Sequence, residues 1–427
     1  MGKNTKTIFK AFDYLHCDDF AKLLMDMAAQ GWHFKEWGVG LKFEKGEPRQ
    51  TVYAVEVFTD ASEYDLRPEP NTTLNLAEYC KEAGWELIDA KRKFCIFKRV
   101  QETAVPILTQ EERVQNAFKE SKGDMIWPLI VAATFVFMQL ADYCNEHYFA
   151  NQIFSAFELS ITFLWGTLLI HRIVKLVIWL YQKNKMKRQL AAGEEVYLGE
   201  KNGKGKAFSH WSTLLVICTA VVGLSLVPAE WMIRMVIMSG ISIGMFLLVS
   251  VLLAKFRPDS STNYMIQIFF ALFYVIVVFV MAMCWDVGER DQAEIVAPVE
   301  KADYMEYGAE REDVVKYENS NILGATQTYI VDYVRVDENL GNGLIYEIYS
   351  SEIDWIMDHI WEMETGKIAE SEKLDCTKAW GAETAFLTGN EKYFVRYEDT
   401  IITFADYDGT ILNQEQIDII CEKLDLR

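Results

Sequence analysis

The residues with the clearest chemical potential lie near the end of the chain. The strand-like run 401–405 is followed by Asp406-Tyr407-Asp408-Gly409-Thr410. Two carboxylates at this spacing could supply a nucleophile and a general acid/base. Only 17 residues of the 427 follow Thr410. A turn after a strand, with Gly409 at positive φ, explains the same letters.

These letters resemble the nucleophile loop of the haloacid dehalogenase superfamily, which implies attack on phosphorus by Asp406 and acid/base catalysis by Asp408. The resemblance also implies a lysine and metal-binding acids downstream, for which the 17 residues after Thr410 leave no room. An EF-hand is excluded, because Ile417 stands where the bidentate Glu is needed. His359 and Glu362 share one face of a predicted helix, but a metal site needs further ligands. We therefore predict a non-enzymatic protein with no cofactor and no metal. An extracytoplasmic hydrolase built on these residues is the alternative.

The eight cysteines are scattered and include no CxxC motif. The last domain holds two of them, Cys376 and Cys421. These two cysteines could form a disulfide if that side of the membrane is oxidising.

Five apolar stretches dominate the middle of the chain. They run over 125–141, 153–181, 211–228, 231–254 and 264–285. A helix needs about 20 apolar residues to cross a bilayer. The sequence therefore predicts a membrane α-helical region of about five spans over 125–285, with the lipid bilayer as its partner.

Basic residues in the short connections predict the orientation of these spans. The connection 182–210 contains seven Lys or Arg residues and 255–263 contains two, whereas 142–152 and 228–230 contain none. Positive connections face the cytoplasm. We therefore expect a multi-pass plasma-membrane protein with a cytoplasmic N-terminus and an extracytoplasmic C-terminus. The basic loop 199–206 would be attracted to anionic lipid.

Three residues within the apolar stretches are candidate functional positions. Glu158 lies about one turn inside the outer boundary and is either a functional carboxylate or an interfacial residue. Gly240 and Gly244 form a GxxxG motif that permits close helix approach. They could pack against another span of the chain or form a homodimer. No predicted span has a central charged residue, which counts against transport.

The first 100 residues contain a duplication at an offset of 53. Gly31-Trp32 and Gly84-Trp85 each follow an amphipathic segment and precede a predicted hairpin. The predicted unit is β-α-β-β, present twice, in an α+β domain over 1–100 with both helices on one face of a sheet. Trp32 and Trp85 are core anchors or ligand platforms. A helical linker over 101–124 leads to the membrane, and Thr109 begins a capping box.

The opening Phe9-Lys10-Ala11-Phe12-Asp13, the Gly-Trp after the first helix and the closing Phe97-Lys98-Arg99 resemble domain-of-unknown-function family 2812. The resemblance covers residues 6–100. It implies a bacterial membrane protein with this small domain ahead of several spans, in a regulatory setting alongside PadR-type transcriptional regulators. A cytoplasmic regulatory protein is thus the implied partner.

The acidity of the chain is concentrated in its last third. Residues 286–427 contain 12 basic and 33 acidic residues, a net charge of −21. Such a surface repels nucleic acid. We predict an acidic stalk over 286–321 and an extracytoplasmic acidic α+β domain over 322–427, in which Asn413 caps the last helix.

A folded domain on each side of spans with no transport signature predicts a function in signalling. We expect a sensor or regulatory protein that couples the outer domain to a cytoplasmic partner. The alternatives are a transporter or an export or immunity component, for which Glu158 is the candidate residue, and the hydrolase described above.

Overall fold

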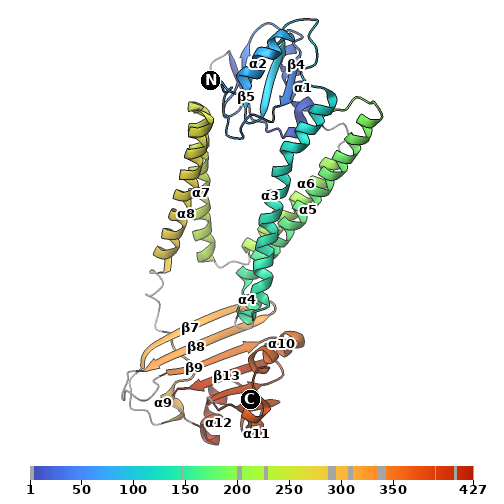
Figure 1. The fold of residues 1–427 in the computed structure, drawn as a ribbon. Helices are drawn as coiled ribbons and strands as arrows, with labels where there is room; N and C mark the ends of the chain where they lie inside the picture. Colours follow the sequence, from blue (N-terminus) through green and yellow to red (C-terminus); the bar gives the residue numbers. More distant parts are fainter. Residues whose placement is uncertain are drawn as a thin grey trace. The chain divides into compact units, whose positions relative to one another are not determined.

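The computed structural model describes residues 4–145, 148–199, 204–225, 229–286, 295–305, 311–333, 343–389, 391–407 and 411–426. The chain divides into two compact units (Figure 1). Unit 1 comprises Met1–Ala133, Thr167–Ile217 and Pro228–Asp286, and unit 2 comprises Thr134–Gly166, Cys218–Val227 and Val287–Arg427. Unit 1 contains the N-terminal domain and unit 2 contains the C-terminal domain.

The N-terminal domain repeats the expected order β-α-β-β. The first half contains β1 (Thr5–Ile8), α1 (Cys17–Ala29), β2 (Trp32–Trp37) and β3 (Leu41–Lys45). The second half contains β4 (Tyr53–Val57), α2 (Thr73–Glu82), β5 (Trp85–Lys91) and β6 (Phe94–Arg99).

Each half forms its own antiparallel sheet, in the orders β1-β3-β2 and β4-β6-β5. The register shifts between Phe34 and Glu36 in the first hairpin and between Leu87 and Asp89 in the second. The two irregularities are therefore 53 residues apart, as are Gly31 (φ +81°) and Gly84 (φ +89°). These glycines end α1 and α2 in a conformation that an L side chain rarely adopts.

The two helices do not share one face of a sheet, which corrects our prediction. Phe94 and Ile96 of β6 belong to the core that includes α1, whereas Cys95 and Phe97 pack with α2. Alternate residues of a strand point to opposite faces. The unbroken apolar run of β6 is therefore covered on both sides, by α1 on one face and α2 on the other.

Four helices of the described chain are long and apolar enough to cross a membrane: α3 (Gln110–Tyr143), α5 (Ala156–Ala191), α7 (Ala229–Phe256) and α8 (Ser260–Asp286). The apolar part of α6 (Lys204–Ser225) is shorter, over His210–Gly223. The structure thus supports four spans of sufficient length, whereas we expected about five. Phe137 and Phe269 are each 72% exposed. Such surfaces are unfavourable in water and suit a lipid environment.

The C-terminal domain is built on a seven-stranded antiparallel sheet of order β10-β11-β12-β13-β9-β8-β7 (Figure 1). Its strands are β7 (Arg311–Asn321), β8 (Gly324–Tyr333), β9 (Gly343–Ser350), β10 (Leu374–Asp375), β11 (Thr384–Leu387), β12 (Lys392–Arg396) and β13 (Thr400–Asp406). Its helices are α9 (Lys301–Tyr304), α10 (Asp354–Thr365), α11 (Thr377–Trp380) and α12 (Gln414–Lys423). Asn413 caps α12 through its side chain, as predicted.

Helices cover both faces of this sheet. Ile402 and Phe404 of β13 pack in the core that includes α9, α11 and α12. Ile401 packs in a second core with α10 and with α4 (Phe149–Phe154). α4 belongs to the connection between α3 and α5, so this connection is part of unit 2.

The predicted stalk over 286–321 needs correction where the structure describes it. Val299 and Tyr304 are buried in the domain core, and β7 pairs with β8 along its length. Edge strands accept many charged side chains. β7 lies at one edge of the sheet, which explains how a polar, acidic sequence forms a strand. Residues 287–294 and 306–310 of the range lie outside the described chain.

Candidate functional site: the junction between the N-terminal domain and the helix connections

The two tryptophans from the duplicated units, Trp32 and Trp85, pack within the N-terminal domain. Trp85 is 8% exposed, and its Nε1 donates a hydrogen bond to the Val105 carbonyl at 2.7 Å. Trp32 is half-buried against the core, with the Lys6 ammonium 5.7 Å from its ring centroid. Trp85 thus anchors the segment that follows β6.

The candidates in the apolar helices lie on two different helices, α5 and α7. Glu158 occupies the first turn of α5, where Gln139 Nε2 donates a long hydrogen bond of 3.5 Å to its Oε2. Gly240 and Gly244 lie on α7, and no atom lies within 4 Å of the position that a Cβ would take at either residue, leaving out each glycine's sequence neighbours and its own helix backbone. Packing of this motif against another described span is therefore not seen, and the homodimer stays a prediction.

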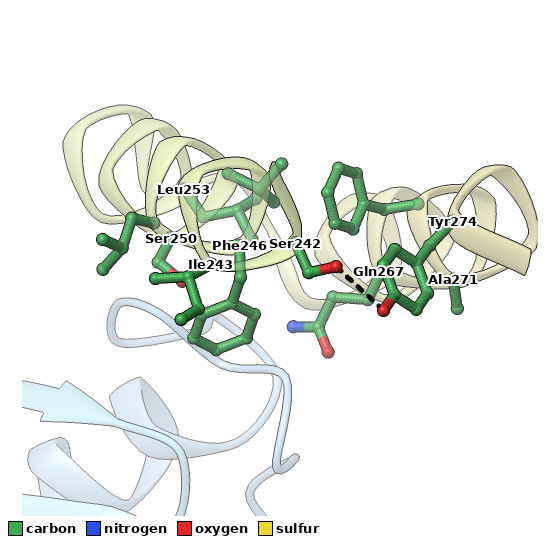
Figure 2. Close-up of a pocket in the computed structure, with 11 residues that line it drawn as sticks. Ser242, Ile243, Phe246, Ser250, Leu253, Gln267, Ala271 and Tyr274 are labelled. Atoms are coloured by element: carbon green, nitrogen blue, oxygen red, sulfur yellow. Dashed lines mark hydrogen bonds between the residues drawn. The ribbon is translucent and has the colours of Figure 1, made fainter. Parts of the chain in front are cut away.

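A groove of about 680 Å³ lies between α7 and α8. Figure 2 shows Ser242 and Tyr274 joined across it, with their hydroxyl oxygens 3.0 Å apart. Ser250 and Gln267 are the other polar residues in an otherwise apolar lining. The lining contains no carboxylate, amine or imidazole, so the groove offers apolar contact rather than acid–base chemistry.

Asp406, the proposed nucleophile, is held in the interior of the C-terminal domain. Lys301 Nζ lies 2.8 Å from its Oδ1, and the Tyr304 hydroxyl donates to its Oδ2 at 2.9 Å. The side chains of Lys301 and Asp406 are 0% and 2% exposed. A carboxylate that attacks a substrate must reach it, and this geometry instead gives Asp406 a structural partner. Asp408, Gly409 and Thr410 lie outside the described residues.

The other candidate residues that the structure describes in this domain do not form a catalytic or metal-binding cluster. The His359 ring lies edge-on to Phe149, with centroids 4.5 Å apart. Within the described residues no group of three or more His, Cys, Asp or Glu side chains could hold a metal. Cys376 and Cys421 are free thiols, so the disulfide considered between them is not formed.

Charged and polar side chains instead gather where the N-terminal domain meets the helix connections of unit 1. The first contact is made by α3. Arg113, in its first turn, lies 2.7 Å from Asp18 Oδ1 and 2.9 Å from Glu56 Oε2. All three side chains are less than one-fifth exposed. The guanidinium therefore ties the start of α3 to α1 and β4.

The second contact is made by the connection after α5. The Leu198 amide donates to Asp18 Oδ2 at 2.6 Å, and the Asp18 amide donates to the Leu198 carbonyl at 2.8 Å. The Tyr197 hydroxyl donates to Asp19 Oδ1 at 2.8 Å. Val196 and Leu198 are buried in the core of the domain. The connection thus packs against the N-terminal end of α1.

The third contact is made by the connection between α7 and α8. Arg257 Nη2 lies 2.6 Å from Asp89 Oδ1, and its Nε donates to the Leu66 carbonyl. Asp89 is 3% exposed, and its Oδ2 accepts the Trp37 amide at 2.6 Å. One carboxylate therefore joins β2, β5 and the α7–α8 connection. Burial raises the pKa of Asp89, and Arg257 opposes the shift.

The start of α8 adds two contacts next to this ion pair. Asn263 Nδ2 donates to the Tyr64 carbonyl at 2.6 Å, and Asn263 is 1% exposed. The rings of Tyr64 and Tyr264 meet edge-on with centroids 4.8 Å apart. We call the following residues, from the three contacts and from the start of α8, the junction: Asp18, Asp19, Glu56, Tyr64, Asp89, Arg113, Tyr197, Leu198, Arg257 and Asn263.

The junction was missed from the sequence because its contacts join distant segments. Comparing the two halves would have given a signal. Glu36 is the counterpart of Asp89 at the offset of 53, and it forms an exposed ion pair with Lys42 at 2.8 Å. Asp89 is buried instead. The structure marks Arg257 in another way, because it has a φ of +43°, which a non-glycine residue rarely adopts.

The stability of the junction is expected to depend on pH through Glu56. Burial raises the pKa of Glu56 to about 7, and the Arg113 guanidinium only partly offsets the shift. An unfolded Glu has a pKa of about 4.3. Protonated Glu56 thus contributes its full stability below the unfolded pKa of about 4.3. This contribution is lost as the pH rises through the folded pKa of about 7. Between pH 5 and 8 the unfolding free energy should fall by about 2 to 3 kcal/mol.

Pulse proteolysis of the N-terminal domain within the full chain, at each pH, measures this free energy. Glu56→Gln removes the titrating group, so its profile should be flatter than that of the wild type. Equal slopes for the two proteins would contradict the assignment.

Residues 17–130 match the model of a family described as protein of unknown function (DUF2812). The match agrees with the resemblance over residues 6–100 and continues into α3. It contains the contributions of the domain and of α3 to the junction, but not Tyr197, Arg257 or Asn263. No curated protein and no solved structure matches the chain.

Proposed function

We propose that this protein is a non-enzymatic membrane sensor or regulator, in which an extracytoplasmic C-terminal domain is coupled to a cytoplasmic N-terminal domain. The proposal counts the shorter apolar helix α6 as a fifth span, since an odd number of spans puts the two domains on opposite sides. One observation carries the proposal. The N-terminal domain is bound by the start of α3 and by the connections α5–α6 and α7–α8. Basic residues assign these same segments to the cytoplasmic side.

The C-terminal domain provides a matching observation for the other side. The connection between α3 and α5, which lacks basic residues, supplies α4 to this domain. Phe154 of α4 is fully buried, and Asn321 Nδ2 of β7 donates to the Ile153 carbonyl at 2.8 Å. Each soluble domain is therefore bound to connections that the charge pattern places on its own side of the membrane.

Continuous helices provide a physical route for coupling. Arg113 lies in the first turn of α3, and the last turn of the same helix leads into the connection that contains α4. A ligand can shift such an element only by binding its two states with different affinity. We infer that a ligand of the C-terminal domain shifts α4, and that the shift alters the contacts of Arg113 and Arg257.

Weakening the α4 contact tests the coupling directly. Phe154→Ala should remove a buried ring from the core shared by α4 and α10, and should loosen α4 locally. If the domains are coupled, amide hydrogen exchange should also change severalfold in β5, beside Asp89. Exchange is measured on the full chain in lipid nanodiscs.

The control for this experiment is Ile322→Ala, since Ile322 lies between β7 and β8 and is 97% exposed. It should leave exchange unchanged at both places. Faster exchange at α4 with no change in β5 would contradict coupling between the domains.

Transport remains the alternative with its own test. A carboxylate used in transport would make flux into liposomes depend on Glu158, so Glu158→Gln should abolish it. The long hydrogen bond from Gln139 to Glu158 fits a Glu158 side chain at the membrane interface. No observation on the described residues favours a transport pathway through the helices.

A further inference from the structure

A second groove lies between α3 and α5, apart from the contacts of the junction. It has a volume of about 630 Å³. Its lining includes three apolar residues, Val114, Phe118 and Leu190, and four lysines, Lys119, Lys122, Lys183 and Lys187. Val114 and Phe118 are 3% and 4% exposed, because they also pack in the core that includes α1. Two of the lysines come from each helix. We call these residues the lysine groove.

The lysines bring uncompensated positive charge to one place. None of the four forms an ion pair with the described residues. Glu111 is the single acidic residue of the lining, and its Oε1 accepts a hydrogen bond from Gln115 Nε2 at 2.8 Å. The groove therefore holds four cationic groups against one carboxylate.

Buried aromatic residues hold one wall of the groove in place. Trp179 is 7% exposed, and its Nε1 donates to Ser121 Oγ at 2.8 Å. Its ring meets Phe118 edge-on at 5.5 Å, and the Lys183 ammonium lies 4.9 Å from the centroid of Trp179. Lys183 is thus positioned by a fixed ring rather than extended into solvent.

We propose that the lysine groove binds the headgroup of an anionic phospholipid, with the phosphate among the lysines and the acyl chains along the apolar parts of α3 and α5. Lys119 and Lys122 immediately precede the predicted span 125–141, and Lys183 and Lys187 immediately follow 153–181. The groove therefore lies at the height of the headgroups on the side of the N-terminal domain. Basic pockets between helices at this level suit anionic lipids.

The position of the lysines next to the predicted spans favours a lipid over a soluble anion. Inorganic phosphate would contact the ammonium groups alone, whereas a phospholipid would also contact the exposed apolar surface of α3 and α5. The proposal is independent of sensing, because it requires insertion of α3 and α5 but no coupling between domains.

Two paired variants of the full chain test the proposal. Lys183→Gln/Lys187→Gln removes two charges from the groove. Lys185→Gln/Arg188→Gln removes the same charge from the same helix, but these residues line a different surface with Tyr181 and Asn184. Binding is measured in detergent by native mass spectrometry, with phosphatidylglycerol and phosphatidylcholine as probes and inorganic phosphate as competitor.

The groove variant should bind phosphatidylglycerol roughly ten- to thirtyfold more weakly than the wild type. The control pair should change binding less than about threefold, on the same electrostatic scale. Phosphatidylcholine should bind equally to all three proteins, and millimolar phosphate should not displace the lipid. An equal loss in both variants would overturn the site in favour of general surface charge. Displacement by phosphate would assign the groove to a soluble anion and overturn the lipid.

Discussion

Replacing Lys301 by Met is expected to lower the thermal midpoint of the C-terminal domain by roughly 10–20 °C. The substitution removes the cation that lies 2.8 Å from Asp406 Oδ1 and leaves a carboxylate that is 2% exposed without it. Removing one partner of a buried ion pair is destabilising by about 3 to 5 kcal/mol. The full chain is heated in steps, and protease cleavage within residues 343–426 measures the unfolded fraction of the C-terminal domain at each temperature.

A second variant shows whether the loss comes from the stranded charge. Lys301→Met/Asp406→Asn removes both charges and retains an oxygen that can accept from Tyr304. It should recover most of the stability, because neither charge is then buried alone. The control is Lys423→Met, whose ion pair with Asp303 at 3.0 Å lies at the surface. That variant should lose less than about 1 kcal/mol. Similar losses for Lys301→Met and Lys423→Met would refute the prediction.

Replacing Arg257 by Ala is expected to open the junction at the α7–α8 connection. Asp89 would lose its partner at 2.6 Å while staying buried by β2 and β5. A loss of about 3 kcal/mol follows for a largely buried pair. Amides of β5 and of residues 62–67 should then exchange roughly a hundredfold faster, since each 1.4 kcal/mol is a factor of ten.

Two further variants assign the effect to the guanidinium. Arg257→Lys keeps the charge but loses the planar fork that reaches Asp89 and the Leu66 carbonyl together, so an intermediate rate is expected. Lys255→Ala removes a cation two residues earlier, in the last turn of α7, and should leave exchange unchanged. Lys255 is exposed, and its ammonium lies over the Phe256 ring. Unchanged exchange in Arg257→Ala would show that the ion pair does not hold the connection.

Local signals in the sequence predicted a large part of the fold. The offset of 53 identified two β-α-β-β units, and the glycines after α1 and α2 have the positive φ expected of helix ends. Asn413 was predicted to cap the last helix, and in the structure its side chain forms a capping box with Gln416. The helix ends and the cap are determined by residues within one turn of the chain, and the duplication is visible because the same local pattern occurs twice.

The predictions that failed depend on contacts between distant residues. The polar residues of β7 were predicted to belong to a stalk. Their pairing with β8 and their place at the edge of the sheet depend on distant residues, so the local sequence does not show them. The helices α1 and α2 were assigned to one face because nothing near them shows that the halves form separate sheets. The junction and the lysine groove are of the same kind, since each arises from segments at least 50 residues apart.

The duplication also provides an internal reference within every molecule. Both halves contain the same irregular hairpin, but Arg257 forms an ion pair with Asp89 in the second, whereas Glu36 in the first pairs with Lys42 and interacts with Arg257 through its charge. A spectroscopic probe on each hairpin should therefore report a larger change at the second when the Arg257–Asp89 pair opens, and equal changes at both when solvent, temperature or membrane acts on the whole protein. The difference between two sites in one molecule would replace a comparison between two samples.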